Sequence, residues 1–203
     1  VRSVMLTEQH RMHPKLAEFP SQHFYGGKLI SAVVASARAP PRGVKWPVPD
    51  LPLLFLDTSM NAAKQDDYQE QRWGSSWRNM GEARLVAEIC RAAVGVSDLA
   101  IGDIGIIAPY SAQVEAIKKH CSVGAAVSSV DAFQGREREL VVFSAVRSAG
   151  RLGFVANARR ANVLLTRARR GLVIVGSAKT LDTDPTWQAW VKWAHAQKCV
   201  RSL

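Results

Sequence analysis

The chain has 203 residues, which is enough for one sizeable hydrophobic core or at most two small domains. Its 47% hydrophobic and 22% charged residues are typical of a folded globular protein and exclude an intrinsically disordered chain. The net charge of +10, from 27 basic and 17 acidic residues, favours a polyanionic partner such as nucleic acid, although solubility alone could also explain it.

The first part of the chain contains few regular patterns. Residues 1–35 are expected to be irregular to helical. Residues 37–52 hold five prolines and predict an extended surface connection. The short apolar run at residues 53–57 predicts a buried strand. Residues 59–78 are polar and unpatterned, which predicts a mobile loop whose two tryptophans anchor it by packing rather than stack on a partner.

From residue 79 onward, helical and strand patterns alternate. The expected helices cover residues 79–94, 111–121 and 157–170, the expected strands cover 104–109, 126–130, 139–146 and 171–177, and a tryptophan stripe at 187–193 predicts a C-terminal helix docked on the core. This alternation predicts an α/β fold with a parallel sheet flanked by helices on both faces. Ligands bind at the carboxyl ends of the strands in such sheets, so we expect the polar loops at 109–113 and 131–139 to lie there.

The ends and the cysteines of the chain indicate its setting. No apolar run is long enough to span a bilayer and no signal-peptide pattern opens the chain, so we expect no membrane partner. Because the chain starts with Val1 rather than methionine, we expect it to be a piece of a longer protein. Cys90, Cys121 and Cys199 form no C-x-x-C pair, which favours a reducing compartment over disulfides or zinc. Cys90 and Cys121 are expected to be buried apolar fillers.

Arginines gather in one region and at one isolated position. Residues 134–170 hold nine arginines, no lysine and only two acidic residues, and the planar guanidinium suits phosphate recognition. In the stretch TEQHRMHPKL, Arg11 lies between His10 and His13, so either the histidines bind a metal or Arg11 faces an anion. Because the two histidines lack a third ligand, we predict no metal site.

Several kinds of active site are poorly supported by the sequence. No G-x-S-x-G elbow accompanies the five histidines, and no carboxylate cluster indicates a metal-dependent nuclease. The tempting Gly26-Gly27-Lys28 is followed by Leu29 and does not make a P-loop, which needs G-x-x-x-x-G-K-[ST]. Arginines that seek phosphate without a phosphate cradle indicate one half of a split ATP site, in which another domain holds the nucleotide and magnesium.

Four blocks of the sequence stand out, namely Glu8–Leu29 (EQHRMHPKLAEFPSQHFYGGKL), Ile104–Gln113 (IGIIAPYSAQ), Ser128–Leu140 (SSVDAFQGREREL) and Arg159–Gly176 (RRANVLLTRARRGLVIVG). Together they resemble the second RecA-like domain of superfamily 1 helicases. They occur in the family's order and are most similar to the subgroup of the up-frameshift helicase of nonsense-mediated mRNA decay and senataxin. The resemblance implies a P-loop NTPase fold without its own P-loop. It also implies that residues 1–203 are a C-terminal helicase domain whose first RecA-like domain is missing.

The resemblance assigns roles at the ATP site. Arg11 corresponds to an arginine that reaches the γ-phosphate across the cleft, and Arg167 corresponds to a second arginine finger. Gly135 and Glu137 match residues near the γ-phosphate and the ribose. His10 stands where the family commonly has a tyrosine that stacks on adenine, which implies weaker base stacking. The implied cofactor is ATP, with Mg²⁺ held mainly by the first RecA-like domain.

The resemblance also implies contacts with single-stranded nucleic acid. Pro109 and Tyr110 lie in a loop similar to one that meets the strand, Ser129 matches a hydroxyl that contacts the backbone, and Arg147 is a further candidate. Such contacts are largely indifferent to base sequence and weaken with salt. Ala108 replaces a frequent threonine and removes one hydroxyl that could take part.

Simpler interpretations remain open for some of these residues. Glu137 could pair locally with Arg136 and Arg138, which flank it, and Arg11 could be a surface ion-pair partner. Arg169 and Arg170 are expected to line the face of the predicted helix and to act through their charge.

The resemblance favours an ATP-dependent 5′-to-3′ RNA or RNA/DNA helicase acting in nonsense-mediated mRNA decay, with the fragment inactive alone. Its expected partners are single-stranded RNA or DNA, the first RecA-like domain and mRNA-decay factors, in the cytoplasm or also in the nucleus. The alternatives are a passive basic nucleic-acid-binding module with a degenerate ATP site, and a related DNA helicase.

Overall fold

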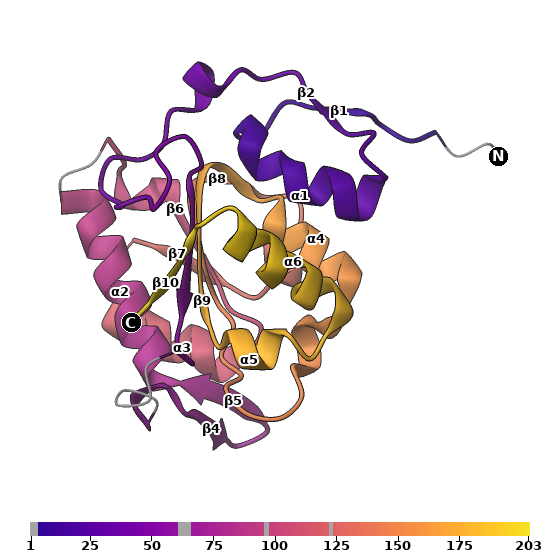
Figure 1. Ribbon diagram of the computed structural model, residues 1–203. Helices are drawn as coiled ribbons and strands as arrows, with labels where there is room; N and C mark the ends of the chain where they lie inside the picture. Colours follow the sequence, from indigo (N-terminus) through magenta and orange to yellow (C-terminus); the bar gives the residue numbers. More distant parts are fainter. Residues whose placement is uncertain (1–3, 61–65, 96–97, 122–123) are drawn as a thin grey trace.

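A six-stranded, all-parallel sheet forms the centre of the protein in the order β10–β3–β9–β8–β6–β7 (Figure 1). The computed structural model describes residues 4–60, 66–95, 98–121 and 124–203. The strands are β3 (Leu53–Asp57), β6 (Ile104–Ile107), β7 (Ala126–Ser128), β8 (Arg138–Ser144), β9 (Ala168–Gly176) and β10 (Val200–Ser202). This arrangement confirms the predicted α/β class and its parallel sheet.

Helices cover both faces of the sheet, as the alternating pattern predicts (Figure 1). Their bounds are α1 (Pro14–Tyr25), α2 (Met80–Gly95), α3 (Ser111–His120), α4 (Ala158–Leu165), α5 (Ala178–Leu181) and α6 (Pro185–Ala196), with short 3₁₀ turns at 35–38, 101–103, 131–133 and 153–156. Helices α2 and α3 pack one core against one face, and α1, α4 and α6 pack a second core against the other. Within the described residues, no helix combines the length and apolarity needed to cross a bilayer.

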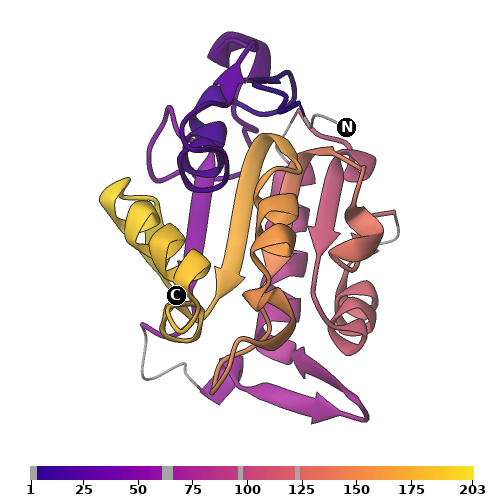
Figure 2. The ribbon, with the colours of Figure 1, turned by 90° about the vertical axis from the view of Figure 1, so that its right-hand side faces the viewer.

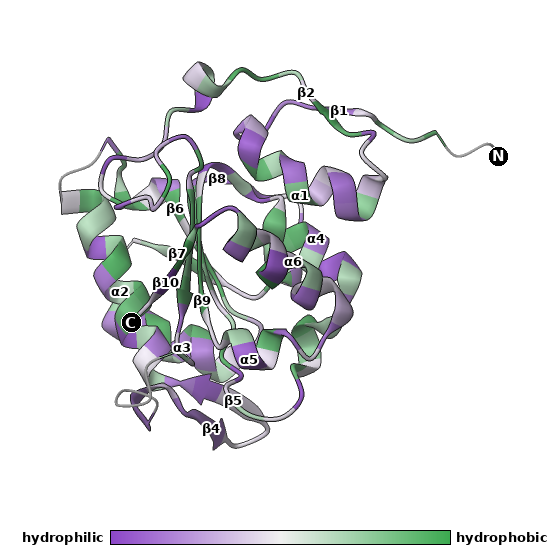
Figure 3. Cartoon of the chain, viewed as in Figure 1, coloured by the Kyte–Doolittle hydropathy of each residue, from purple (hydrophilic) through white to green (hydrophobic). Residues whose placement is uncertain are grey.

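The chemistry of the side chains explains why these elements form. Strands β6 and β8 contain runs of apolar, mostly branched residues that are buried between the helices. Figure 3 shows green strands at the centre, between helices with more polar surfaces. Asp184 accepts hydrogen bonds from Thr186 N and Trp187 N and so caps α6, which begins with Pro185. The Trp187 ring is fully buried, which confirms that this helix docks on the core.

The helix predicted over residues 157–170 is too long. Helix α4 ends at Leu165, and Thr166 Oγ1 bonds back to Asn162 O at 2.7 Å. Strand β9 then begins at Ala168, which pairs with Arg138 of β8. Arg169 and Arg170 therefore lie in a strand rather than on a helix face, because pairing with β8 outweighs the helix propensity of arginine and alanine.

The loop predicted over residues 59–78 is also wrong in its second half. Strands β4 (Glu70–Trp73) and β5 (Ser76–Asn79) form an antiparallel hairpin around a two-residue turn. Gly74 has a φ of +59°, which suits the tight turns of two-residue hairpin loops. Residues 61–65 of the predicted loop lie outside the described residues. Figure 2 shows the hairpin projecting from one end of the sheet.

Segments gather at two opposite edges of the sheet. The loop at 109–113 follows β6 at the carboxyl edge, as expected, together with the hairpin (Figure 1). The loop at 131–139 does not stay there, because β8 starts at Arg138 and the chain must first return to the amino edge. The N-terminal segment reaches the same amino edge, where β1 (Glu8–Gln9) pairs with β2 (Ile30–Ser31) and His13 N donates to Arg169 O at 2.8 Å.

Candidate functional site

A cavity of about 660 Å³ lies at the amino edge of the sheet. It brings together four of the five residues that the sequence assigns to ATP, namely His10, Arg11, Glu137 and Arg167. These residues come from opposite ends of the chain, yet they share one wall because β8 and β9 start side by side. Gly135, the fifth, does not line the cavity; it has a φ of +79° in the turn two residues before Glu137.

Arg11 is held in place by two acceptors. Its Nε donates to Glu137 Oε2 at 2.5 Å, and its Nη1 donates to Thr166 O at 3.0 Å. Nη2 has no hydrogen-bond partner among the described residues. Bonding to the Arg11 guanidinium lowers the pKa of Glu137, with further help from Arg169 and Arg167. Glu137 thus pairs with a residue 126 positions away, not with the flanking Arg136 and Arg138 as the local alternative supposed.

Arg167 lies beside this ion pair. Its Nε donates to Val163 O at 2.8 Å and its Nη2 donates to Thr166 Oγ1 at 2.8 Å, so the guanidinium is anchored to the end of α4. Burial and the neighbouring charge of Arg11 lower the pKa of Arg167 to about 10, and it stays charged at neutral pH. Glu8 and Glu137 balance the charges of Arg11 and Arg167 in the lining of the cavity. The two guanidiniums nevertheless offer forked N–H donors that suit an anion such as a phosphate.

The loop that carries Arg11 is braced by residues to which the sequence assigned no role. Gln9 Nε2 donates to Met12 O at 2.9 Å, and Gln9 Oε1 accepts from Met12 N at 2.7 Å. Arg38 Nε donates to Arg11 O at 2.8 Å. Gln9 lies in the same block of sequence as Arg11, and that block could have indicated its role. No pattern in the sequence indicates the role of Arg38.

His10 and Tyr25 offer the cavity two different rings. The His10 side chain is 73% exposed and lies 3.8 Å from Glu8 Oε2. Tyr25, at the end of α1, lines the same cavity, and its hydroxyl accepts a hydrogen bond from Asn162 Nδ2 at 3.0 Å. Sequence reasoning missed Tyr25, which occurs among apolar anchors of the first block.

The nucleic-acid candidates lie at the opposite, carboxyl edge, but not equally exposed. Tyr110 and Arg147 both approach Gly153, where a Cβ would stand 2.6 Å from Tyr110 Oη and 3.2 Å from Arg147 Nη1. Pro109 is buried, whereas Ser129 is half-exposed and its Oγ accepts from Ala132 N at 3.3 Å. Ser129 directly follows the last residue of β7.

Arg147 is already engaged within the protein. Its Nε donates to Glu70 Oε2 at 2.9 Å, its guanidinium lies 4.4 Å from the centre of the Trp77 ring, and only 14% of its side chain is exposed. The bond to Glu70 raises the pKa of Arg147. The geometry of Arg147 therefore suits a residue that holds the loops of the carboxyl edge in place better than one that contacts a phosphate.

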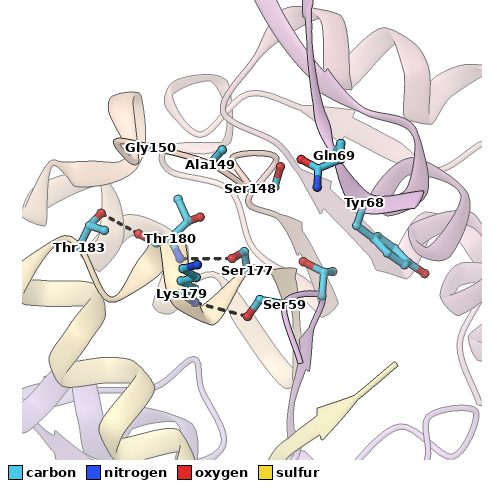
Figure 4. A pocket seen from close by; sticks show the side chains of 11 residues that line it. Ser59, Tyr68, Gln69, Ser148, Ala149, Gly150, Ser177, Lys179, Thr180 and Thr183 are labelled. Atoms are coloured by element: carbon cyan, nitrogen blue, oxygen red, sulfur yellow. Dashed lines mark hydrogen bonds between the residues drawn. The ribbon is translucent and has the colours of Figure 1, made fainter. Parts of the chain in front are cut away.

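A second cavity of about 430 Å³ opens at the carboxyl edge, between the ends of β3 and β9 and the loop after β8 (Figure 4). Hydroxyl groups dominate its lining, and Figure 4 shows Lys179 among them. Ser177 Oγ accepts from Thr180 N at 3.2 Å, and Lys179 N lies 3.5 Å from Ser59 Oγ. Hydroxyls with one amine suit a phosphate or another polar ligand, although no residue of this cavity was selected from the sequence.

The described residues do not offer a metal site. No group of three or more His, Cys, Asp or Glu side chains among them could hold a metal ion. Of the two histidines weighed as metal ligands, His13 is buried and its Nδ1 accepts from Lys15 N at the start of α1. These residues therefore do not fit a magnesium site.

Comparison with known proteins shows the family of the chain. The AAA domain family matches residues 1–179. The chain belongs to this family. It is 37% identical over 198 residues to "Regulator of nonsense transcripts 1" of Dictyostelium discoideum, covering 92% of this chain and 14% of the relative. It is 36% identical to "ATP-dependent helicase upf1" of Schizosaccharomyces pombe, covering 92% and 21%. These relatives confirm the resemblance of the four blocks to the up-frameshift helicases.

The similarity extends over most of this chain but over only a small part of each relative. The chain is also 33% identical to "ATP-dependent helicase NAM7" of Saccharomyces cerevisiae, covering 91% of the chain and 20% of the relative. It thus spans only about a fifth or less of the length of these curated relatives. Among solved structures, the PRRSV nsp10 helicase is similar at 13% identity, with a TM-score of 0.40 over 87% of this chain and 24% of that one.

Proposed function

We propose that this chain is the second motor domain of an ATP-dependent 5′-to-3′ helicase acting on RNA or RNA/DNA, within a longer protein that supplies the first RecA-like domain. The observation that carries the proposal is the convergence of Arg11 and Arg167 on one cavity at the amino edge of the sheet. Family membership and the names of the relatives support a helicase motor.

In this proposal Arg11 and Arg167 are the arginine fingers of a split ATP site. Arg11 has Nη2 without a partner among the described residues, and its ion pair with Glu137 fixes the direction of the guanidinium. A γ-phosphoryl group entering between the two guanidiniums would gain charge-assisted hydrogen bonds as negative charge develops on its oxygens. In the absence of nucleotide the Glu137 carboxylate would pair with the Arg11 guanidinium, and on nucleotide binding the phosphate would replace part of this contact.

His10 and Gly135 take supporting roles in the proposal. The exposed His10 ring, at the rim of the cavity, would face the adenine. Gly135 would let the backbone turn toward the nucleotide, because its left-handed φ favours glycine. Mg²⁺ is assigned to the first RecA-like domain, and no step is assigned to the metal here.

The carboxyl edge would carry part of the single-strand track. Pro109, Tyr110, Ser129 and Arg147 all follow the carboxyl ends of strands, opposite the proposed ATP site, and Arg147, held by Glu70, would position this edge for the strand. ATP-driven closure at one edge could therefore change the grip on nucleic acid at the other. We further propose mRNA-decay factors as partners, nonsense-mediated mRNA decay as the setting, and the cytoplasm, or also the nucleus, as the location.

The test is steady-state ATP turnover by the full-length protein, with and without single-stranded RNA. Arg167→Ala and Arg11→Ala should each lower RNA-stimulated turnover by on the order of 10³-fold or more, as measured for other arginine fingers. Arg201→Ala is the matched control, since Arg201 is exposed on β10 and bonds only to the backbone carbonyls of Lys198 and Val200 among the described residues. Thermal melting would verify that each variant folds.

The outcomes separate the two candidate functions. Turnover lost in Arg167→Ala with RNA binding retained would support the motor domain. A wild-type protein that binds RNA without hydrolysing ATP would instead make this a passive nucleic-acid-binding module. Turnover by Arg11→Ala and Arg167→Ala at the wild-type rate would show that neither arginine reaches the γ-phosphate.

A further inference from the structure

The β4–β5 hairpin presents an exposed aromatic ring at the carboxyl edge. Trp73, the last residue of β4, is 55% exposed and is the one aromatic residue among the exposed large apolar side chains of the described chain. The sequence predicted that both tryptophans anchor this segment by packing. This is correct for Trp77, which is half-buried beneath Arg147, but wrong for Trp73.

The root of the hairpin is firmly attached to the sheet edge. The Glu70 carboxylate accepts from Arg147 Nε at 2.9 Å and from Ser148 N at 2.7 Å, and Ser148 Oγ accepts from Glu70 N at 2.8 Å. On β5, Ser76 Oγ accepts from Ala112 N at 3.2 Å at the start of α3. An exposed ring on a fixed support loses little conformational entropy when a ligand covers it.

One arginine lies over the exposed ring, and a second is its neighbour in β4. The Arg78 guanidinium lies 3.6 Å from the centre of the Trp73 ring, and Arg78 Nε donates to Gln71 Oε1 at 3.3 Å. Arg72, the preceding residue of β4, is exposed and its Nε donates to Gly74 O at 3.3 Å in the turn, and residues 71–78 contain no acidic residue. A cation–π contact on one face orients the ring and leaves its other face for a second flat group.

The hairpin also continues the polar surface of the carboxyl edge. Tyr68, Gln69 and Ser148, at its root, line the 430 Å³ cavity of hydroxyl groups and Lys179 shown in Figure 4. A ligand that fits both features must combine flat aromatic groups with anionic groups along its length. Single-stranded nucleic acid meets this description, because its unpaired bases stack on aromatic rings and its phosphates pair with arginines.

We propose that the tip of the β4–β5 hairpin is a binding site for single-stranded nucleic acid, in which Trp73 stacks on an unpaired base and Arg72 contacts the neighbouring phosphate. Arg78 is a positioning residue that holds the ring. The site rests on the proposed function and extends the nucleic-acid track beyond the residues that the sequence indicated.

The test measures the binding of a fluorescein-labelled oligouridylate to the full-length protein by fluorescence anisotropy over a range of salt concentrations. Trp73→Ala should raise the Kd about fivefold or more, as for other stacked bases. Trp73→Phe should restore most of the affinity, because it keeps an aromatic face. The salt dependence should be unchanged in Trp73→Ala and shallower by about 0.7 in Arg72→Ala, which loses one phosphate contact. Arg201→Ala is again the matched control for charge.

Photocrosslinking supplies a readout that a merely structural role would not move. An oligouridylate carrying 5-iodouridine should crosslink to the peptide that contains Trp73, as identified by mass spectrometry. The inference would be overturned if Trp73→Ala bound the oligouridylate as tightly as wild type. It would also be overturned if Trp73→Ala and Trp73→Phe lost affinity equally and no crosslink formed. The exposed ring would then be assigned to contact with a protein partner.

The two proposals fail in different ways. If the wild-type protein binds RNA independently of Trp73 while Arg167→Ala abolishes turnover, the hairpin site is wrong and the motor domain stands. If the wild-type protein does not bind RNA, both are wrong.

Discussion

Replacing the buried Glu82 by glutamine should remove a large part of the pH dependence of stability. Glu82, on α2, is completely buried, and its Oε2 accepts from Ser144 Oγ at 2.6 Å and from Val146 N at 2.9 Å. The second bond holds Val146 at a φ of +72°, which is rare for a branched residue. Glu82 therefore supports the backbone next to Arg147, at the carboxyl edge.

The size of the effect follows from the pKa of Glu82. Burial penalises the ionised carboxylate and raises its pKa from 4.5 to about 7, although the bonds from Ser144 and Val146 partly oppose this. The folded protein therefore holds the proton more tightly than the unfolded chain. The contribution of Glu82 to the free energy of unfolding is therefore fully present below about pH 4.5 and is lost as the pH rises through 7. Each unit of pH in this window is worth about 1.4 kcal/mol, which gives a loss of ~3 kcal/mol.

The assay is urea unfolding of wild type and Glu82→Gln at several pH values between 5 and 8. The glutamine amide oxygen can take the place of Oε2 and carries no charge, so the variant should gain ~3 kcal/mol relative to wild type as the pH rises across the window. Glu88→Gln, at an exposed position of the same helix, is the matched control and should show no such trend. Parallel pH profiles for wild type and Glu82→Gln would refute the reasoning.

Three further predictions concern packing, thiol chemistry and a helix cap. Gly105→Ala should destabilise the fold by about 1–3 kcal/mol, because its Cβ would stand 2.5 Å from the buried Phe133 ring; chemical unfolding measures this, and an unchanged midpoint would contradict it. Cys121 should react with iodoacetamide faster than Cys90 in timed mass spectrometry, since a hydrogen bond from Cys90 lowers the pKa of the half-buried Cys121 and raises that of the buried Cys90; equal rates would oppose this. Asp184→Ala should cost about 1 kcal/mol by removing the cap of α6, and Asp184→Asn should restore most of it in thermal melts.

Local patterns predicted the elements well where one physical signal dominated. The branched residues of β6 and β8 and the tryptophan stripe of α6 lie where the sequence placed them. Composition also indicated the arginine-rich region, and the order of the blocks indicated the family. The cysteine prediction held for Cys90, which is buried, but less well for Cys121, which is half-exposed beside it.

Prediction failed where pairing partners were distant in sequence. Arg169 and Arg170 continue a helical pattern, and only the approach of β8 makes them part of β9. The polar residues of β4 and β5 bury little surface, so their hairpin depends on the Gly74 turn and on the bonds of Glu70 to the loop after β8. Neither contact is visible as a periodicity.

The sequence by itself determined which side chains could serve a phosphate, because guanidinium chemistry and motif order are written in the residues: Arg11 and Arg167 were selected without a structure. Only the tertiary structure decided where they lie. The parallel pairing of β8 with β9 brings Glu137 and Thr166 together at the amino edge, and the Arg11 loop closes on both. Tyr110 and the hairpin that carries Trp73 lie at the opposite edge. All strands of a parallel sheet run in the same direction, so the loops that follow the strands lie at one end of the sheet and the loops that precede them lie at the other.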